Sequence, residues 1–198
     1  VKEVPEVAQR MIDKFWPGPL TIILEKNDII PNMTSANLNT VGIRMPSSEI
    51  ALKLIELSKR PIAAPSANIS GRPSPTKGIH VYHEMNNRVD GIIIGGDCTF
   101  GLESTVLDLT NDVPMILRPG SITKEDLENV IGHVNMDPAL EKKEDNIKAK
   151  APGMKYKHYS PNAEVFIVSG KTDDVANKIN ELVDNNSKEG LKTVVMCL

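Results

Sequence analysis

The chain has 198 residues, of which 40% are apolar and 25% are charged, enough to bury one full core and part of a second. Its 23 Lys and Arg residues against 26 Asp and Glu residues give a net charge of −3, so no global basic excess holds a nucleic acid. Cys98 and Cys197 are the only cysteines, which argues against a disulfide scaffold, a zinc ribbon and an iron–sulfur site. The longest apolar runs are far shorter than the roughly 20 residues of a membrane span. We therefore expect a soluble, cytoplasmic protein with no membrane partner.

The two ends of the chain indicate a fragment. Val1 is not a methionine, and no signal peptide follows it. Residues 194–198 form an apolar run of the kind that fills a buried strand. We therefore expect a piece of a longer protein.

Alternating helices and strands are predicted up to residue 64. Apolar residues spaced i, i+4 behind Pro5 favour a first helix, and Ser47 or Ser48 is placed to cap a second one. A strand that contains Arg44 has one polar face. The predicted elements are helices over 5–15 and 48–59 and strands over 20–25, 40–45 and 61–64. Together they favour a βαβ unit.

A stretch rich in Ser, Asn, Gly and Pro follows at 65–76 and predicts turns rather than a helix or a strand. After it, short apolar runs predict strands over 91–94, 105–109 and 114–117. Thr123 and Asp126 have the spacing of a capping box, which predicts a helix that ends near Gly132.

The composition changes again after this helix. Residues 136–150 carry four acids and four bases and are typical of a linker or a solvated helix. Residues 151–161 contain three lysine or histidine side chains, two tyrosines and no acid, which is unusual for a passive tether. A strand over 165–168, a helix over 173–183 and a strand over 193–198 then predict the opening of a second α/β domain. The expected divisions are a first domain over 1–135, a linker over 136–162 and a second domain over 163–198.

Positive charge is concentrated in residues 40–88, which hold seven Lys or Arg against three Glu. Such an excess fits an anion-binding face, and it equally fits one solvated face of an acidic protein. Within it, the stretch 64–71 follows a short apolar strand, so hydroxyls and backbone N–H groups emerge at a strand end, where phosphates bind. This stretch matches neither a P-loop nor a dinucleotide-binding turn, and a purely structural Ser/Asn turn is the alternative.

Several single residues leave two interpretations open. Arg44 and Arg118 each lie in or at the end of a predicted strand, where a cation needs either an acidic partner or an anionic ligand. Ser104 opens a strand, as a cap or turn residue commonly does. His80 and His83 are spaced i, i+3 without a third ligand, so we predict no metal site. No nucleophile elbow and no Cys/His arrangement is present, and we assign no covalent or acid–base catalytic residue.

Several segments together resemble the YrdC-type threonylcarbamoyl-AMP synthases in their two-domain form. The matching segments, in chain order, are 14–21 (KFWPGPLT), 40–46 (TVGIRMP), 64–71 (APSANISG) with 74–76 (SPT), 103–108 (ESTVLD) and 117–120 (LRPG). The stretch 151–161 (APGMKYKHYSP) resembles the linker that joins the catalytic domain of this family to a smaller C-terminal domain. The resemblance covers residues 4–161, and a chance match of so many ordered motifs is improbable.

The resemblance implies a fold and an activity. The fold is an open twisted α/β sheet of the YrdC type with a concave polar face, followed by a linker that acts as a lid and by the start of a smaller Rossmann-like domain. The activity is synthesis of L-threonylcarbamoyladenylate from ATP, L-threonine and bicarbonate with release of pyrophosphate. The product serves N6-threonylcarbamoyladenosine at position 37 of tRNAs that read codons starting with A. ATP is a substrate that carries Mg²⁺, and a tRNA or a tRNA-modification complex is the implied macromolecular partner.

Carried over residue by residue, the resemblance implies two sets of contacts. The residues expected to bind ATP are Thr40, Ser66, Ser74, Arg118 and Tyr159. The residues expected to bind L-threonine are Arg44, Ala64 and Ser104. Weaker candidates are Asn68, Ser70 and His158. A planar guanidinium suits both anions, so Arg44 would meet the threonine carboxylate and Arg118 the phosphate.

The chain departs from the family pattern in two places. The family's N-terminal part, with a strand-borne threonine and a Lys-x-Arg motif that grips ATP, has no counterpart before Val1, so we expect this piece alone to be inactive. The family often carries a histidine shortly after its arginine–proline strand, where this chain has Ser47 and Ser48.

Three other functions compete with the synthase. A carbamoyltransferase of hydrogenase maturation contains a related domain, but it adds paired Cys-x-x-Cys zinc fingers that two isolated cysteines do not match. A non-catalytic module for double-stranded RNA would use the positive segment and ignore threonine. A regulatory domain would bind a nucleotide without turning it over.

Overall fold

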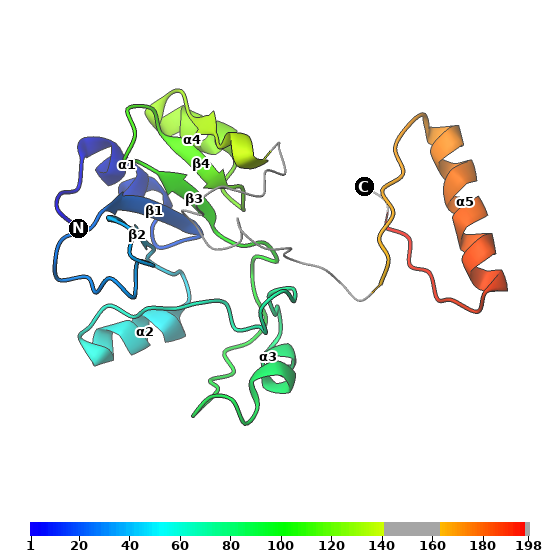
Figure 1. The fold of residues 1–198 in the computed structure, drawn as a ribbon, viewed down its shortest axis with the longest axis horizontal. Coiled ribbons are helices and arrows are strands. Elements are labelled where there is room, and N and C mark those ends of the chain that lie inside the picture. The colour runs from blue at the N-terminus through cyan, green and yellow to red at the C-terminus, as the bar shows by residue number, and fades with distance from the viewer. Residues whose placement is uncertain (141–162, 197–198) are drawn as a thin grey trace. The chain divides into compact units, whose positions relative to one another are not determined.

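A five-stranded sheet forms the centre of the first 140 residues (Figure 1). The computed structural model of the chain describes residues 1–140 and 163–196. The helices are α1 (Glu6–Phe15), α2 (Glu49–Ser58), α3 (Gly78–Met85), α4 (Lys124–Ile131) and α5 (Thr172–Lys188). The strands are β1 (Leu20–Glu25), β2 (Thr40–Ile43), β3 (Thr105–Asp108), β4 (Met115–Arg118) and β5 (Asn135–Met136). The chain divides into two units, Val1–Ser160 and Pro161–Leu198.

The strand order of the sheet is β2-β1-β3-β4-β5. β1 pairs antiparallel with β2 and parallel with β3, and β4 pairs antiparallel with β3 and parallel with β5. β1 and β3 are neighbours although α2 and α3 lie between them in the sequence. The register therefore sets residues that are far apart in the chain beside one another, as it does for Leu20 and Thr105.

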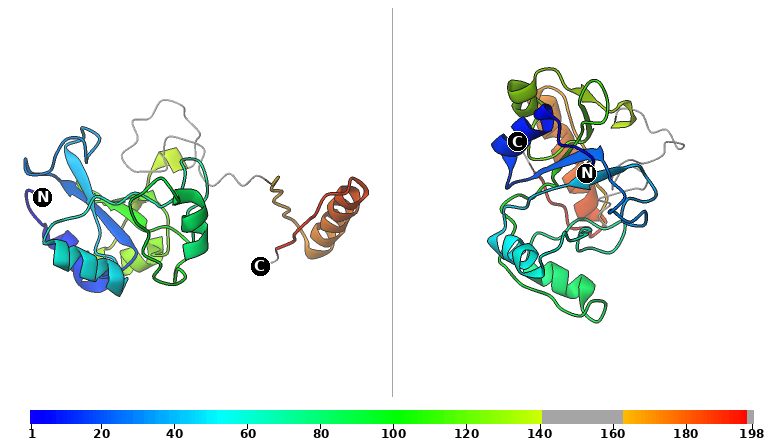
Figure 2. Two further views of the ribbon diagram at one scale, coloured as in Figure 1. Left: turned by 90° about the horizontal axis from the view of Figure 1, so that it is seen from below. Right: turned by 90° about the vertical axis from the view of Figure 1, so that its left-hand side faces the viewer.

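Helices α1 and α4 cover one face of the sheet (Figures 1 and 2). Side chains alternate along β1, so Leu20, Ile22 and Leu24 point to the same face, and each is at most 5% exposed. Met11 of α1 and Leu127 of α4 belong to the same cluster and are fully buried. Because each such side chain contributes roughly 1.5–3 kcal/mol when buried, this face holds the main core of the unit.

The opposite face of the sheet has a smaller apolar cluster. It consists of Ile23, Val106 and Leu117, with Met115 packed against them. At Gly42 of β2 an added Cβ would lie 3.2 Å from the Thr21 methyl group, so a larger residue would crowd β1 there. Small and polar residues thus accompany the apolar ones on this face.

Local signals correctly predicted the ends of α1 and α4. Pro5 is the N-cap of α1. The Thr123 hydroxyl accepts a hydrogen bond from the Asp126 N–H at 3.1 Å, and the Asp126 carboxylate accepts one from the Thr123 N–H at 3.0 Å, which confirms the capping box. Gly132 caps the other end of α4. The strands predicted over 20–25, 105–109 and 114–117 are confirmed within one residue at each end, and the strand over 40–45 ends two residues early.

The strands predicted over 61–64 and 91–94 are wrong. Neither segment joins the sheet or another strand among the described residues. The βαβ unit expected before residue 65 is therefore also wrong, since β2 runs antiparallel to β1 and the strand parallel to β1 that follows α2 is β3, which begins only at Thr105. A short apolar run becomes a strand only where a neighbour accepts its backbone hydrogen bonds, and the run itself does not carry that information.

Helix α2 forms as predicted, with Ser48 as its N-cap. The apolar stripe along it does not belong to the core, because Ile50, Leu54 and Leu57 are 44%, 49% and 68% exposed. No residue of α2 or of α3 is buried. The region between β2 and β3 is thus folded locally but packed loosely.

The second unit is described from residue 163 to residue 196 and contains helix α5. The helix predicted over 173–183 is confirmed and runs further, to Lys188. The strands predicted over 165–168 and 193–198 are not found among the described residues, so the Rossmann-like arrangement is not confirmed. Strand signals of this kind depend on pairing partners that the described part of the unit does not supply. None of the helices within 1–140 and 163–196 is both long and apolar enough to span a membrane.

Candidate functional site

Four strand ends converge at one end of the sheet, and polar side chains gather there. β1 and β3 begin at this end, whereas β2 and β4 finish there. Arg118, the last residue of β4, faces Glu103 and Ser104, which precede β3. Its Nη1 lies 2.7 Å from Glu103 Oε2, and its Nε and Nη2 donate to the Ser104 carbonyl at 3.1 and 2.9 Å. Nη2 also donates to Ser104 Oγ at 3.0 Å, so the guanidinium is held from two sides.

Two further hydroxyl groups join this arrangement. Ser74 Oγ donates to Glu103 Oε1 at 2.7 Å. Ser104 Oγ lies 2.9 Å from Thr21 Oγ1 on β1. We call these five residues, Thr21, Ser74, Glu103, Ser104 and Arg118, the strand-end cluster. It joins three strands and the loop before α3.

The turn after β4 fixes the start of β3. The buried Thr105 hydroxyl donates to the Ile122 carbonyl at 2.6 Å and accepts from the Ile122 N–H at 3.1 Å. An added Cβ at Gly120 would collide with the Glu103 carbonyl and would lie only 2.7 Å from the Ser104 carbonyl carbon. Glycine is therefore required for the turn to approach β3 this closely. The Arg-Pro-Gly sequence thereby sets the distance between Arg118 and the residues that hold it.

Arg44 follows β2 at the same end of the sheet. The pKa of Arg44 is lowered from its ordinary value, first because burial desolvates the guanidinium and second because Arg118 carries the same charge. The Gly18 N–H donates to the Met45 carbonyl at 2.8 Å, which fixes the chain next to Arg44. A bound anion would offset the repulsion between the two guanidinium groups and the desolvation of Arg44.

The loop 64–72 is held to α3 through Glu84. The Ile69 N–H donates to Glu84 Oε2 at 2.7 Å, and Arg72 Nη1 lies 3.5 Å from Glu84 Oε1. The Asn68 amide donates to the carbonyls of Ile69 and Arg72 at 3.1 and 3.0 Å. The sequence left two interpretations of this loop open, a phosphate-binding loop and a purely structural turn. These hydrogen bonds are of the kind that a structural turn makes.

The structure brings some of the predicted site residues together and leaves others apart. Those in the strand-end cluster or beside it are Arg44, Ser74, Ser104 and Arg118. Thr40 begins β2 and pairs with Glu25, at the far end of that strand from Arg44. The loop 64–72 carries Ala64, Ser66, Asn68 and Ser70, and of these only Asn68 is not exposed. His158 and Tyr159 lie outside the described residues.

Sequence reasoning missed two members of the strand-end cluster, Thr21 and Glu103. Both belong to motifs that carry the family resemblance, but neither received a role. Arg118 could have led to Glu103, because an arginine in a strand whose side chain is only 21% exposed needs a carboxylate partner. The acidic-partner interpretation of Arg118 is confirmed. Thr21 is 83 positions from Ser104, and only the sheet register joins them.

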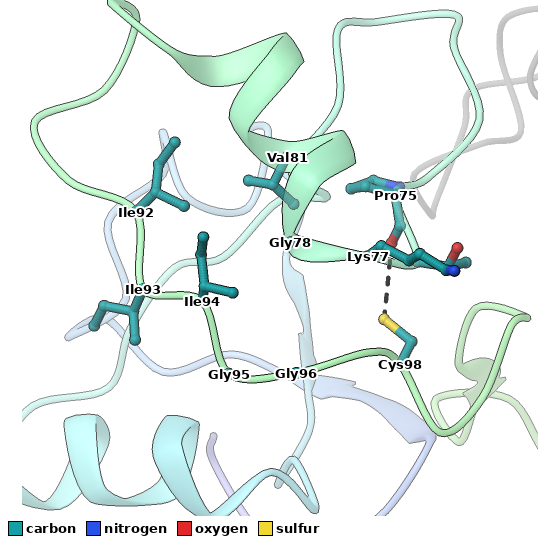
Figure 3. Close-up of a pocket in the computed structure, with 11 residues that line it drawn as sticks. Pro75, Lys77, Gly78, Val81, Ile92, Ile93, Ile94, Gly95, Gly96 and Cys98 are labelled. Atoms are coloured by element: carbon teal, nitrogen blue, oxygen red, sulfur yellow. Dashed lines mark hydrogen bonds between the residues drawn. The ribbon is translucent and has the colours of Figure 1, made fainter.

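A cavity of about 100 Å³ lies beside α3, between its first turn and residues 92–98 (Figure 3). Its lining is mostly apolar, with Val81 and Ile94 pointing inward and Cys98 Sγ donating to the Pro75 carbonyl at 3.8 Å. Lys77 is the one charged residue in the lining. Among residues 1–140 and 163–196, no group of three or more His, Cys, Asp or Glu side chains could hold a metal ion. The strand-end cluster, where charged groups converge, is therefore the better candidate for an anionic substrate.

Two family models match the chain. The model named Telomere recombination, for the Sua5, YciO and YrdC proteins, matches residues 1–120. The model for the C-terminal domain of threonylcarbamoyl-AMP synthase matches residues 122–198. The two matches together span nearly the whole chain.

Curated relatives and a solved structure agree with these matches. The threonylcarbamoyl-AMP synthase of Pyrococcus abyssi is 51% identical over 195 residues, covering 98% of this chain and 57% of the relative. That of Bacillus subtilis is 46% identical over 190 residues, covering 96% of this chain and 54% of the relative. The crystal structure of P. abyssi Sua5 complexed with L-threonine matches with a TM-score of 0.90 at 51% identity, covering 96% of this chain and 56% of that one.

The chain therefore spans little more than half the length of these relatives. The structural match confirms the expected open α/β sheet of the YrdC type. The chain belongs to the Sua5/YciO/YrdC family, in the two-domain form that also carries the Sua5 C-terminal domain.

Proposed function

We propose that this protein makes L-threonylcarbamoyladenylate from ATP, L-threonine and bicarbonate, with release of pyrophosphate. The relatives of P. abyssi and B. subtilis bear the name threonylcarbamoyl-AMP synthase, and the matching P. abyssi structure contains L-threonine. The single observation that carries the proposal is the placement of Arg44 and Arg118 at the same end of the sheet, beside the strand-end cluster. The reaction brings a carboxylate and a triphosphate to one place, and two cations at one end of the sheet suit that task.

The proposed chemistry needs positioning and charge neutralisation more than a protein nucleophile. The threonine amine attacks the carbon of bicarbonate, a C–O bond breaks and water leaves, which gives a carbamate. A carbamate oxygen then attacks the α-phosphorus of ATP. The bond from that phosphorus to the bridging oxygen breaks, and pyrophosphate leaves with the electron pair. Mg²⁺ arrives as part of the substrate, on the nucleotide, and offsets charge on the leaving phosphates.

On the threonine side, Arg44 would hold the carboxylate through a bidentate ion pair. Ser104 would supply a hydroxyl, which Arg118 and Thr21 already orient at 3.0 and 2.9 Å. Ala64, a small residue at the head of the loop 64–72, would let the substrate approach the backbone.

On the ATP side, the proposed contacts come from the strand-end cluster and from the loop 64–72. Arg118 and Ser74 would meet the phosphates from the cluster, and Ser66 from the loop. Asn68 has its amide donors in the loop itself, so its contribution would be to shape the loop rather than to bind phosphate. The further assignments to ATP are Thr40 and Tyr159, and the weaker site candidates are Ser70 and His158.

The cellular role follows from the same proposal. The product would serve N6-threonylcarbamoyladenosine at position 37 of tRNAs that read codons starting with A, in the cytoplasm, with a tRNA-modification enzyme as the consumer. In this arrangement residues 1–135 would belong to the catalytic domain, 136–162 to the linker and 163–198 to the C-terminal domain.

The experiment is an assay of pyrophosphate release by the complete natural protein with ATP, Mg²⁺ and bicarbonate, with and without L-threonine. Threonine-dependent release together with the adenylate mass by mass spectrometry would support the synthase. Absence of release together with salt-sensitive binding of double-stranded RNA would instead support the non-catalytic module. Nucleotide binding without either result would indicate the regulatory domain.

A further inference from the structure

We propose that Glu103 is a positioning residue that holds Ser74 and Arg118 in the geometry that receives ATP. The inference rests on the proposed function, and it adds Glu103 to the residues that form the proposed ATP site. Glu103 is the member of the strand-end cluster that contacts both of the cluster's proposed ATP residues.

Each oxygen of the Glu103 carboxylate contacts a different residue of the strand-end cluster. Oε1 accepts from Ser74 Oγ at 2.7 Å, and Oε2 lies 2.7 Å from Arg118 Nη1. Both distances are in the range of charge-assisted hydrogen bonds, which are the stronger kind. The Glu103 side chain is 23% exposed and that of Arg118 is 21% exposed, so water competes with these bonds less than it would at the surface.

The charge of Glu103 favours a supporting role over direct contact with substrate. A carboxylate repels a phosphate group, so Glu103 would not bind ATP itself. Its negative charge instead pairs with Arg118, whose positive charge acts on Arg44 as a like charge. Glu103 thereby reduces the net positive charge at this end of the sheet before any anionic substrate arrives.

Holding these side chains in place lowers the cost of binding. A free arginine or serine loses rotamer entropy when it closes on a ligand, and a side chain that is already fixed does not. Ser74 and Glu103 are 29 positions apart in the chain, and this bond ties the loop before α3 to the start of β3. Arg118 also keeps its three bonds to Ser104, so loss of Glu103 should misalign the site without unfolding the protein.

The test compares Glu103→Gln with Glu128→Gln in the complete natural protein. Glu128, on α4, accepts from the Val134 N–H at 3.2 Å and pairs with Lys124 at 3.6 Å, which makes it a matched carboxylate away from the strand-end cluster. For Glu103→Gln we expect the KM for ATP to rise about tenfold, while the KM for L-threonine stays within about twofold. Glu128→Gln should leave both constants at the wild-type values.

A double-mutant cycle then tests the link to Ser74. If Glu103 acts partly through Ser74, the rise in the KM for ATP caused by Ser74→Ala should be smaller in the Glu103→Gln background than in the wild type, because both changes disrupt the Ser74–Glu103 contact. Fully additive effects would contradict this arm of the proposal. An ATP KM for Glu103→Gln equal to that of the wild type would overturn the whole of it, as would an equal rise in both KM values with a lowered melting temperature.

A measurement without substrate separates this inference from the proposed function. The Arg118 Nη signals in ¹⁵N NMR spectra should be resolved in the wild type, where the Glu103 ion pair restrains Nη1, and averaged in Glu103→Gln, because rotation about the Cζ–Nη1 bond becomes faster. A wild-type protein without threonine-dependent pyrophosphate release would reject the synthase, and the NMR comparison would still decide whether Glu103 fixes Arg118. An unchanged signal in Glu103→Gln would contradict the positioning role in either case.

Discussion

Helices α2 and α4 are both capped and amphipathic, yet only α4 buries its apolar side chains. Leu127 of α4 is fully buried against the sheet, whereas Leu54 of α2 is 49% exposed. The difference lies in what surrounds each helix, because α4 packs with α1 on the sheet and no residue of α2 is buried. An amphipathic pattern thus predicts that a helix needs a partner, and it does not supply one.

The first way to test this comparison is to truncate both leucines. Leu127→Ala should lower the free energy of unfolding by about 2–5 kcal/mol, because it leaves a cavity in the main core. Leu54→Ala should lower it by less than about 1 kcal/mol, since half of that side chain is already in water. Urea unfolding followed by circular dichroism measures both. Equal losses would mean that α2 is packed as tightly as α4.

The sequence predictions were accurate for elements that pack in the sheet or on it, and they failed for two segments between β2 and β3. α1, β1 and α4 were predicted closely, because their local patterns and caps agree with the partners that the fold gives them. The segments 61–64 and 91–94 were mispredicted as strands, since strand formation depends on a neighbour that a local pattern cannot specify.

The candidate site divides in a similar way. Arg44, Ser104 and Arg118 were found through motifs of the family, and each lies at the strand ends where the cluster forms. The bonds that unite the cluster were not predictable, because they join residues that are 29 and 83 positions apart. The register of β1, β3 and β4 places Thr21, Ser104 and Arg118 together, and the bond from Ser74 to Glu103 adds the loop before α3.

The second prediction concerns Arg44, which lies in the sequence between β2 and the exposed helix α2. If it binds the threonine carboxylate, Arg44→Ala should raise the KM for L-threonine about 10- to 100-fold, the loss expected for hydrogen bonds to a charged group. The unfolding free energy should change little, because loss of Arg44 also relieves its desolvation and its repulsion by Arg118. Pyrophosphate release at varied threonine concentrations measures the change.

Arg60→Ala is the matched control for Arg44. Arg60 is an exposed arginine in the same positively charged segment, so its loss removes the same net charge without touching the cluster. Arg44→Lys, which keeps the charge but not the planar fork, should fall between Arg44→Ala and the wild type. An equal effect of Arg60→Ala would mean that overall charge, and not the position of Arg44, attracts the substrate.

The third prediction compares two glycines. Gly120→Ala should lower the free energy of unfolding by about 1–3 kcal/mol, because the new Cβ overlaps the backbone of residues 103–105 and neither side can move easily. Gly91→Ala should be nearly neutral, since no atom lies within 4 Å of its added Cβ. Thermal unfolding of both variants is the measurement. A neutral Gly120→Ala would show that the turn after β4 can shift away from β3.

The smallest expected effect on stability comes from the capping box of α4. It can be measured through its dependence on pH. The pKa of Asp126 is lowered from its ordinary value of 3.8, first because its carboxylate accepts the Thr123 N–H and then because it accepts the Thr123 hydroxyl. A carboxyl group whose pKa is lower in the folded protein stabilises the fold above its unfolded pKa. That contribution is lost as the pH falls through the folded pKa.

Asp126→Asn removes the charge at every pH and therefore provides the comparison. At pH 7 the variant should be less stable than the wild type, and the difference should shrink as the pH falls below about 3.8. Thr123→Ala removes the hydroxyl that caps the helix and should cost about 1 kcal/mol at pH 7. Unfolding curves at a series of pH values measure both differences. A gap between Asp126→Asn and the wild type that stays constant down to pH 2 would mean that the Asp126 charge does not stabilise α4.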